Sequence, residues 1–251
     1  MIDEIKEIEM IRDCDILRVW RFVGQSNRLV ICFSGLGKDH SQPPGIEFAE
    51  TAIGDNLDHV LYISDPNRSW LNQPGLVDEI VALIDEVKLE TDIDDVATLG
   101  HSMGGFSACV LPYFTPVQNV LALSPQVSVD PAIVPDDPRW MEHREAIDGF
   151  EISDVASYLV PETQYVVVYG RHGREAPQRD RFPNPDQLSI FVMPQTNHNT
   201  AARLKGSGAL QELRDLVFDG KIEEVGAHLA KTMRAYQLEG EPIRPFGEDS
   251  E

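Results

Sequence analysis

The stretch Val96-Ala97-Thr98-Leu99-Gly100-His101-Ser102-Met103-Gly104-Gly105-Phe106-Ser107-Ala108 carries the strongest structural signal in this sequence. An apolar, strand-like run ends in the pattern Gly-x-Ser-x-Gly and passes directly into small residues that are compatible with a helix. This order is typical of a sharp strand-to-helix turn that exposes a serine hydroxyl at the end of a sheet. Glycines let the neighbouring backbone pass close to such a turn. We therefore interpret Ser102 as a candidate nucleophile, although a plain glycine-rich turn is the alternative.

Short apolar, β-branched runs separated by turn residues indicate further strands. The run 16–23 alternates apolar and polar residues, as a half-exposed antiparallel edge strand does. The other runs are more continuously apolar, as strands buried on both faces are; they cover 29–33, 59–63, 96–99, 119–123, 164–169 and 188–193. Helical patterns lie between several of them, notably over 75–88 and 105–114, and two more follow over 209–218 and 221–238. This alternation predicts right-handed crossovers and a mostly parallel sheet.

The pattern around Ser102 resembles the nucleophile elbow of the α/β-hydrolases, and the order of elements fits that superfamily from about residue 17 to 229. The resemblance implies a three-layer α/β/α sandwich and a Ser-His-acid triad, with no cofactor and no metal. We expect one domain over residues 1–251. The segment 126–161 is where the superfamily carries its caps; here it is short and polar, with a helix expected over 138–147. Residues 239–251 form an acidic, proline-containing tail.

Composition limits the classes of partner. A chain of 251 residues with 42% hydrophobic residues can bury a full core. Its formal net charge of −21 argues against binding nucleic acid or an anionic membrane surface. The N-terminus lacks the pattern of a signal peptide, and no apolar run reaches the ~20 residues that span a bilayer. The three cysteines have no metal-ligand spacing, and Cys32 and Cys109 are expected in the core. The sequence thus favours a cytoplasmic protein that acts on a small molecule, and it carries no signal for the oligomeric state.

The general base is expected on the loop that follows the last long strand, 188–193. His198 lies in this loop with a helical pattern after it, and the chain order serine, acid, histidine fits the superfamily. A neutral imidazole there can take the serine proton and return it to a leaving group. The remaining histidines have no such context; they are His40, His59, His143, His172 and His228. His101 is next to the nucleophile, in a slot that usually packs under the elbow and borders the substrate site.

The acid is expected in the loop 171–181, after the strand 164–169, and two carboxylates compete for the role. Glu175 is closer to the strand end, at the usual distance. Asp180 is the more frequent residue type in this position, and Asp180-Arg181 resembles a pair found in relatives with a long loop. Either carboxylate could hold the imidazole in the correct tautomer. We prefer Asp180 and keep Glu175 as the alternative.

An oxyanion hole requires two backbone donors aimed at one point. The N–H of Met103 comes with the elbow, and the N–H of Leu36 follows the strand 29–33. Many α/β-hydrolases have His-Gly-x in this loop; here it is Ser34-Gly35-Leu36, which keeps the glycine, and Gly35 is expected to border the substrate. In the cap, Trp140 faces the active site or, alternatively, anchors the segment to the main body.

Three functions are compatible with this sequence. The preferred one is a serine hydrolase that cleaves a carboxylic ester or thioester through an acyl-serine. The alternatives are an acyltransferase or another enzyme on the same framework, and a catalytically silent binding protein. A fold alone does not choose among them. An intact serine and histidine argue against the silent protein.

Overall fold

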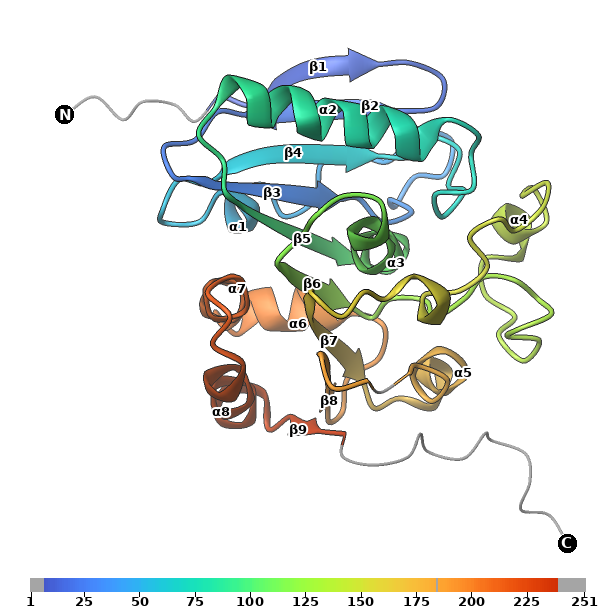
Figure 1. Ribbon diagram of the computed structural model, residues 1–251. Helices are drawn as coiled ribbons and strands as arrows, with labels where there is room; N and C mark the ends of the chain where they lie inside the picture. The colour runs from blue at the N-terminus through green and yellow to red at the C-terminus, as the bar shows by residue number, and fades with distance from the viewer. Residues whose placement is uncertain (1–6, 184, 239–251) are drawn as a thin grey trace, which may run out of the picture.

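The computed structural model describes residues 7–183 and 185–238, which form one nine-stranded sheet flanked by helices (Figure 1). The strands follow the spatial order β1-β2-β4-β3-β5-β6-β7-β8-β9, and the neighbours from β4 through β8 pair in parallel. These parallel strands are β3 (Arg28–Phe33), β4 (His59–Ser64), β5 (Asp95–His101), β6 (Asn119–Leu123), β7 (Gln164–Gly170) and β8 (Leu188–Met193). Their near-continuous burial explains why the sequence revealed each of them. The prediction of a mostly parallel sheet is confirmed.

The two edges of the sheet are antiparallel. β2 (Arg18–Phe22) pairs antiparallel with β4, as expected, but it is not the edge strand. β1 (Glu9–Asp13) covers its outer side, and β9 (Tyr236–Gln237) covers β8 at the other end of the sheet. The sequence did not reveal these two strands, because β1 is mostly exposed and β9 has only two residues. The helix expected over 221–238 ends at Met233, where Arg234 adopts a left-handed backbone and the chain continues into β9. Residues 239–251, expected as an acidic tail, lie outside the described residues.

Helices cover both faces of the sheet (Figure 1). α2 (Leu76–Glu90) and α3 (Met103–Val110) pack on one face, and the short 3-10 helix η1 (Leu111–Tyr113) extends α3. The other face carries α1 (Ala49–Ile53), α6 (Thr200–Gly206), α7 (Leu210–Phe218) and α8 (Ile222–Met233). Successive residues of β3 alternate between the two hydrophobic cores, with Ile31 in one and Cys32 in the other. Cys109 is also buried, on α3. The three-layer architecture is thus present.

The segment between β6 and β7 forms the cap (Figure 1). It contains α4 (Met141–Arg144) and the 3-10 helix η2 (Ala156–Tyr158). α4 is shorter than the helix expected over 138–147, because Trp140 has a left-handed backbone with φ of 59° and blocks extension towards Pro138. Between β7 and β8, the 3-10 helix η3 (Gly173–Glu175) runs into α5 (Ala176–Arg179). Within 7–183 and 185–238, no helix combines the length and apolar character needed to cross a membrane.

Candidate active site

Ser102 lies at the sharp turn between β5 and α3, with φ of 58° and ψ of −122°. Two glycines make this strained turn sterically feasible. A Cβ on Gly100 would lie 2.0 Å from the carbonyl oxygen of Gly104, and one on Gly104 would lie 2.4 Å from that of Phe33. The Gly104 oxygen belongs to the start of α3 and the Phe33 oxygen to the end of β3, so a side chain at either glycine would push apart elements that the turn holds together. The structure therefore has the elbow that the sequence predicted, with its serine at the carboxyl end of the sheet.

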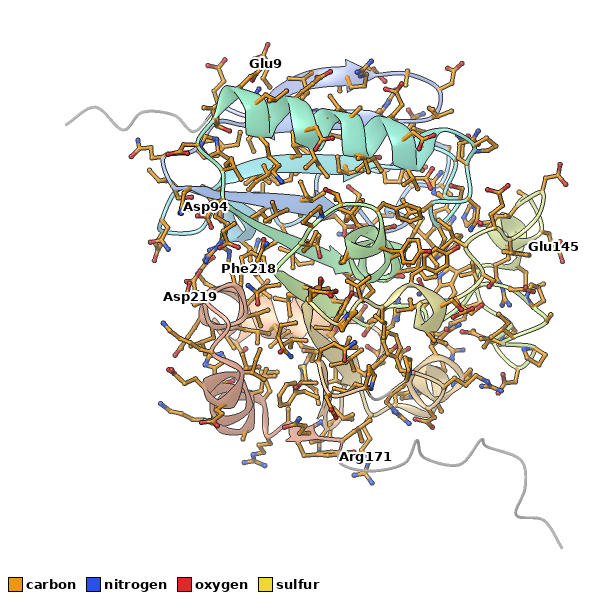
Figure 2. All side chains as sticks on the ribbon, in the orientation of Figure 1. Glu9, Asp94, Glu145, Arg171, Phe218 and Asp219 are labelled. Carbon is orange, nitrogen blue, oxygen red and sulfur yellow. The ribbon has the colours of Figure 1, made fainter. Side chains whose placement is uncertain are left out.

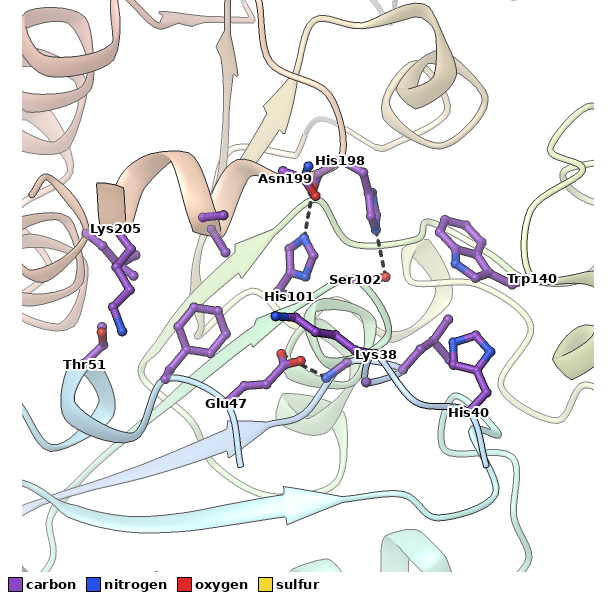
Figure 3. Close-up of a pocket in the computed structure, with 17 residues that line it drawn as sticks. Lys38, His40, Glu47, Thr51, His101, Ser102, Trp140, His198, Asn199 and Lys205 are labelled. Carbon is purple, nitrogen blue, oxygen red and sulfur yellow. Dashed lines mark hydrogen bonds between the residues drawn. The ribbon is translucent and has the colours of Figure 1, made fainter. Parts of the chain in front are cut away.

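His198 faces Ser102 from the loop that follows β8 (Figure 3). Its Nε2 lies 2.9 Å from Ser102 Oγ. The hydroxyl has the proton to donate, so Nε2 is the accepting nitrogen when the imidazole is neutral. The histidine chosen from the sequence thus lies beside the candidate nucleophile, in position to remove its proton.

The carboxylate beside His198 is Glu175, not the preferred Asp180. Glu175 Oε2 accepts a hydrogen bond from His198 Nδ1 at 3.0 Å, and Glu175 is 1% exposed. Asp180 instead accepts two hydrogen bonds from Arg179, at 2.6 and 3.2 Å. The structure thus brings Glu175, the alternative kept from the sequence, to His198 and leaves the preferred Asp180 paired with Arg179. η3 turns the chain immediately after β7 and brings Glu175 over the sheet, whereas Asp180 follows α5 and faces its own neighbouring arginine.

Arg139, from the cap, holds the second oxygen of Glu175. Its Nη1 donates to Glu175 Oε1 at 2.6 Å, while its Nε and Nη2 both donate to the buried Asp137 at 2.8 Å. Burial alone would raise the pKa of Glu175. The hydrogen bond and positive charge of His198, together with Arg139, outweigh it and lower the pKa below its usual value. The carboxylate is therefore ionised at neutral pH and can stabilise an imidazolium on His198.

Two backbone N–H groups are free to form the expected oxyanion hole. Among the described residues, neither the Met103 N–H nor the Leu36 N–H has an intramolecular acceptor. The adjacent Gly35 N–H is occupied instead, because it donates to Glu47 Oε2 at 3.2 Å (Figure 3). That hydrogen bond fixes the loop after β3 beside the elbow.

A pocket of about 570 Å³ opens beside Ser102. Gly35, His101 and Trp140 all line it, at the positions expected to border a substrate (Figure 3). His101 also contacts the loop of the candidate base, because its Nε2 lies 2.8 Å from the backbone oxygen of His198. Burial and the neighbouring His198 lower the pKa of His101 to about 4. Trp140 lies on the other side of His198, with the ring centroids 5.3 Å apart. Both rings restrict the orientation of the imidazole.

Comparison with known proteins finds relatives by structure but not by sequence. No protein-family model and no curated protein matches this sequence. Solved structures do match its fold. An esterase from Pyrobaculum calidifontis gives a TM-score of 0.60 at 13% identity, with 87% of this chain and 86% of that one covered. The chain has the α/β-hydrolase fold.

Two further structures share this hydrolase fold. The fluorophosphonate-binding serine hydrolase F of Staphylococcus aureus gives a TM-score of 0.56 at 13% identity, covering 84% of this chain and 97% of that one. The capsule O-acetyltransferase of Neisseria meningitidis serogroup A gives 0.56 at 15% identity, covering 79% and 92%. Hydrolytic and acyl-transferring proteins are therefore both among the structures that this chain resembles.

Gln126, a residue that contacts the candidate nucleophile Ser102, was not predicted from the sequence. Gln126, fully buried just after β6, donates from Nε2 to Ser102 Oγ at 3.1 Å. Its Oε1 accepts a hydrogen bond from Trp70 Nε1 at 2.9 Å, which fixes the amide orientation. The one available signal was its place at the carboxyl end of the strand next to β5, where functional side chains of parallel sheets gather.

Proposed function

We propose that this chain is a serine hydrolase that cleaves a carboxylic ester or thioester through an acyl-serine intermediate. The observation that carries the proposal is the continuous relay from Ser102 Oγ to His198 Nε2 at 2.9 Å and from His198 Nδ1 to Glu175 Oε2 at 3.0 Å. A weak alcohol nucleophile needs an adjacent base, and the base needs a third group to orient it. All three are in hydrogen-bonding range of one another.

The geometry supports a two-step reaction. As Ser102 Oγ attacks the acyl carbonyl, its proton passes to His198 Nε2, and Glu175 stabilises the resulting imidazolium. The carbonyl oxygen becomes negative and is stabilised by the N–H groups of Met103 and Leu36. His198 then protonates the leaving alcohol or thiol, which leaves the acyl group on Ser102. A water molecule, deprotonated by His198, attacks this ester; the acyl–Oγ bond breaks, His198 returns the proton to Ser102 Oγ, and the acid is released.

The pocket supports a substrate of modest size that carries negative charge. Leu36 and Phe48 give it apolar walls. Lys38, from the loop after β3, and Lys205, from α6, also line it (Figure 3). Lysines are scarce in a chain with twice as many acidic as basic residues, so two at one pocket create a local positive potential. Glu47 opposes them, although burial raises the pKa of its carboxyl group and so weakens its charge relative to an exposed glutamate. We therefore favour an acyl ester or thioester that bears an anionic group.

A second function, acyl transfer, shares the first half of this reaction. The same acyl-serine is formed, and an alcohol replaces water as the acceptor. The likeness in fold to the capsule O-acetyltransferase is the observation that keeps this alternative open.

The test is turnover on matched pairs of esters and thioesters with increasing acyl length, each with and without a terminal carboxylate. The proposal predicts release of free acid, a lower KM for the carboxylated member of each pair, and a loss of several orders of magnitude in kcat for Ser102→Ala. Lys205→Met should abolish the preference for the carboxylate, whereas the exposed Lys231→Met on α8 should keep it. Acyl transfer to added alcohols without hydrolysis would replace the first function with the second. Hydrolysis by Ser102→Ala at the wild-type rate would overturn both.

A further inference from the structure

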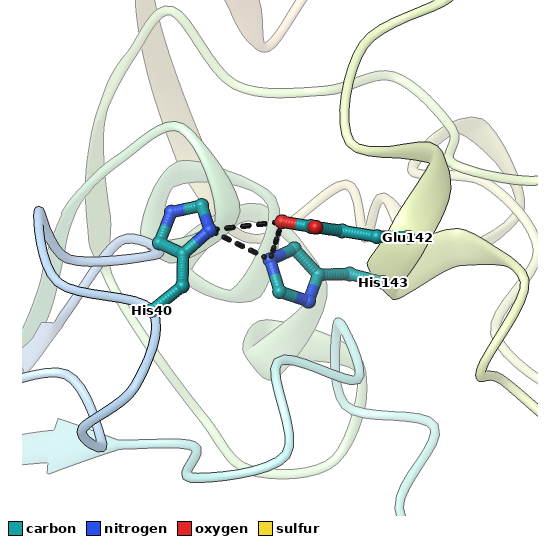
Figure 4. A group of neighbouring side chains, drawn as sticks. All are labelled: His40, Glu142 and His143. Carbon is teal, nitrogen blue, oxygen red and sulfur yellow. Dashed lines mark hydrogen bonds and ion pairs between the residues drawn. The ribbon is translucent and has the colours of Figure 1, made fainter.

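Three side chains whose types can bind a metal meet beside the pocket, outside the Ser102 relay (Figure 4), and His40 among them lines the pocket. His40 comes from the loop after β3, and Glu142 and His143 come from α4 of the cap. His40 Nδ1 lies 2.9 Å from Glu142 Oε1 and 3.3 Å from His143 Nε2, and the last two atoms are 3.2 Å apart. Three potential ligand atoms therefore face one point from two segments 102 residues apart in the chain.

These separations fit a tetrahedral zinc ion. Zinc binds histidine nitrogen and carboxylate oxygen at about 2.0–2.2 Å, so adjacent ligands of a tetrahedron lie about 3.3–3.5 Å apart. The three observed distances fall at or slightly below this range. Little movement is needed for a metal to replace the direct contacts. Two imidazoles and one carboxylate also suit zinc better than magnesium or calcium, which prefer oxygen ligands.

Buried arginines hold both ligand-bearing segments in place. Arg68 shapes the His40 loop by donating to the backbone oxygens of Leu36 at 2.9 Å, Asp39 at 3.3 Å and Gln42 at 2.7 Å. Arg144, next to His143, donates to the backbone oxygens of Val129 at 2.6 Å and Val134 at 3.2 Å. Arg68 and Arg144 are 6% and 2% exposed. A site pre-organised in this way loses less conformational entropy when a metal binds.

We propose that His40, Glu142 and His143 bind one zinc ion, with a water molecule in the fourth position. The ion would tie the loop that carries Leu36 to the cap segment that carries Trp140. Leu36 and Trp140 both line the pocket, so zinc binding would fix the separation of the two segments that carry them. The exposed Glu142 carboxylate and the strongly negative chain both attract a divalent cation to this point. Zinc binding here does not depend on the proposed ester chemistry.

The test is a zinc titration of the full, chelator-treated chain in competition with a chromophoric zinc indicator. We expect one zinc ion per chain and a higher unfolding temperature in its presence. His40→Ala and His143→Ala should each weaken binding by about tenfold or more, since each removes a direct ligand. Glu142→Gln should weaken it as well. Glu145→Gln makes the same chemical change at an exposed carboxylate just after α4, labelled in Figure 2, and should leave the affinity unchanged.

Three results would overturn the proposal. The first is the absence of stoichiometric zinc binding by the wild type. The second is undiminished affinity in His40→Ala and His143→Ala. The third is binding that is lost in His198→Ala but retained in His143→Ala, which would place the ion on the His101–His198 pair. Thermal unfolding of each variant without zinc shows whether it is folded, so a misfolded variant is not counted as a lost ligand.

Discussion

At the scale of single residues, the candidate site is defined by what surrounds Ser102 Oγ. The oxygen contacts His198 Nε2 at 2.9 Å and Gln126 Nε2 at 3.1 Å. Ser102 and Gln126 are buried, whereas His198 is partly exposed towards the pocket. A hydroxyl can donate one hydrogen bond and accept others. Its proton therefore points to His198 while Gln126 donates to a lone pair. The two contacts together fix the rotamer of the serine before any substrate arrives.

The identity of the acid gives the first prediction. Glu175→Gln should lower kcat by about 10²–10⁴-fold with little change in KM, because an amide neither fixes the tautomer nor stabilises the imidazolium. Asp180→Asn is the matched control, because it makes the same change to a buried carboxylate in the same loop that contacts Arg179 instead of His198. Steady-state kinetics on one ester decide the matter. A larger loss in the Asp180 variant would contradict the assignment.

Gln126 gives the second prediction. Gln126→Met keeps the length of the side chain but removes the donor to Ser102 Oγ, so we expect kcat to fall by about 10–100-fold from the misplaced hydroxyl. Trp70→Phe keeps Gln126 but removes the donor to its Oε1, along with part of a buried ring, and it should cause a smaller loss of kcat. Single-turnover kinetics separate the acylation step from binding. An unchanged acylation rate in Gln126→Met would show that the contact is only structural.

His101 gives a prediction about pH. Its pKa is lowered to about 4 in the folded protein, from an ordinary value of 6.5. The unfolded chain therefore binds a proton that the folded chain refuses, and stability falls as the pH drops below 6.5. By about pH 5 this group should cost the wild type about 2 kcal/mol of unfolding free energy relative to neutral pH. His101→Gln removes that component, and urea unfolding at both pH values measures it. Equal losses in wild type and variant would contradict the shift.

At the scale of secondary structure elements, α7 is attached to the sheet by a buried charge. Arg214 is fully buried, forms an ion pair with the buried Asp58, and donates to the backbone oxygen of Ala52 at 2.9 Å. Removing one member of such a pair leaves the other charge buried without its partner. Arg214→Met should therefore lower the unfolding free energy by about 3–5 kcal/mol in a urea titration. Arg203→Met, on the exposed face of α6, should change it by less than about 0.5 kcal/mol. Equal effects would contradict this role.

The elements also show what the sequence could and could not predict. Buried strands such as β5 and β7 are apolar runs of their own, so their positions could be predicted within about two residues. β1 and β9 owe their structure to pairing with a neighbouring strand and have no apolar run. The sequence offered both Glu175 and Asp180 as the acid and could not rank them by geometry, because the turn of η3 that brings Glu175 to His198 has no clear residue pattern. Arg139 meets Glu175 across 36 residues, and Gln126 meets Ser102 across 24, so the tertiary fold rather than the local sequence brings each pair together.

At the scale of the whole molecule, the two ends of the parallel strands have different roles. Ser102, Glu175 and His198 follow the carboxyl ends of β5, β7 and β8, although they are far apart in the sequence. The opposite ends are held by Arg28, which pairs with Asp95 at 2.5 Å and donates to the backbone oxygen of Phe218 at 2.9 Å. Figure 2 shows Asp94, Phe218 and Asp219 near one another beside the start of β5. The candidate site thus lies at one end of the parallel strands, and the Arg28 contacts hold β3 and β5 at the other end.

The central claim is that this arrangement makes Ser102 a nucleophile. The most direct measurement is the reaction of the full chain with a fluorophosphonate, followed by intact mass and peptide mapping. We predict one adduct per chain on Ser102, none in Ser102→Ala, and a strongly slowed reaction in His198→Ala, which lacks the base. Ser107→Ala, in the same helix but hydrogen-bonded to the backbone oxygen of Met103, should react like the wild type. An adduct that persists in Ser102→Ala, or a wild type that resists the probe, would contradict the claim.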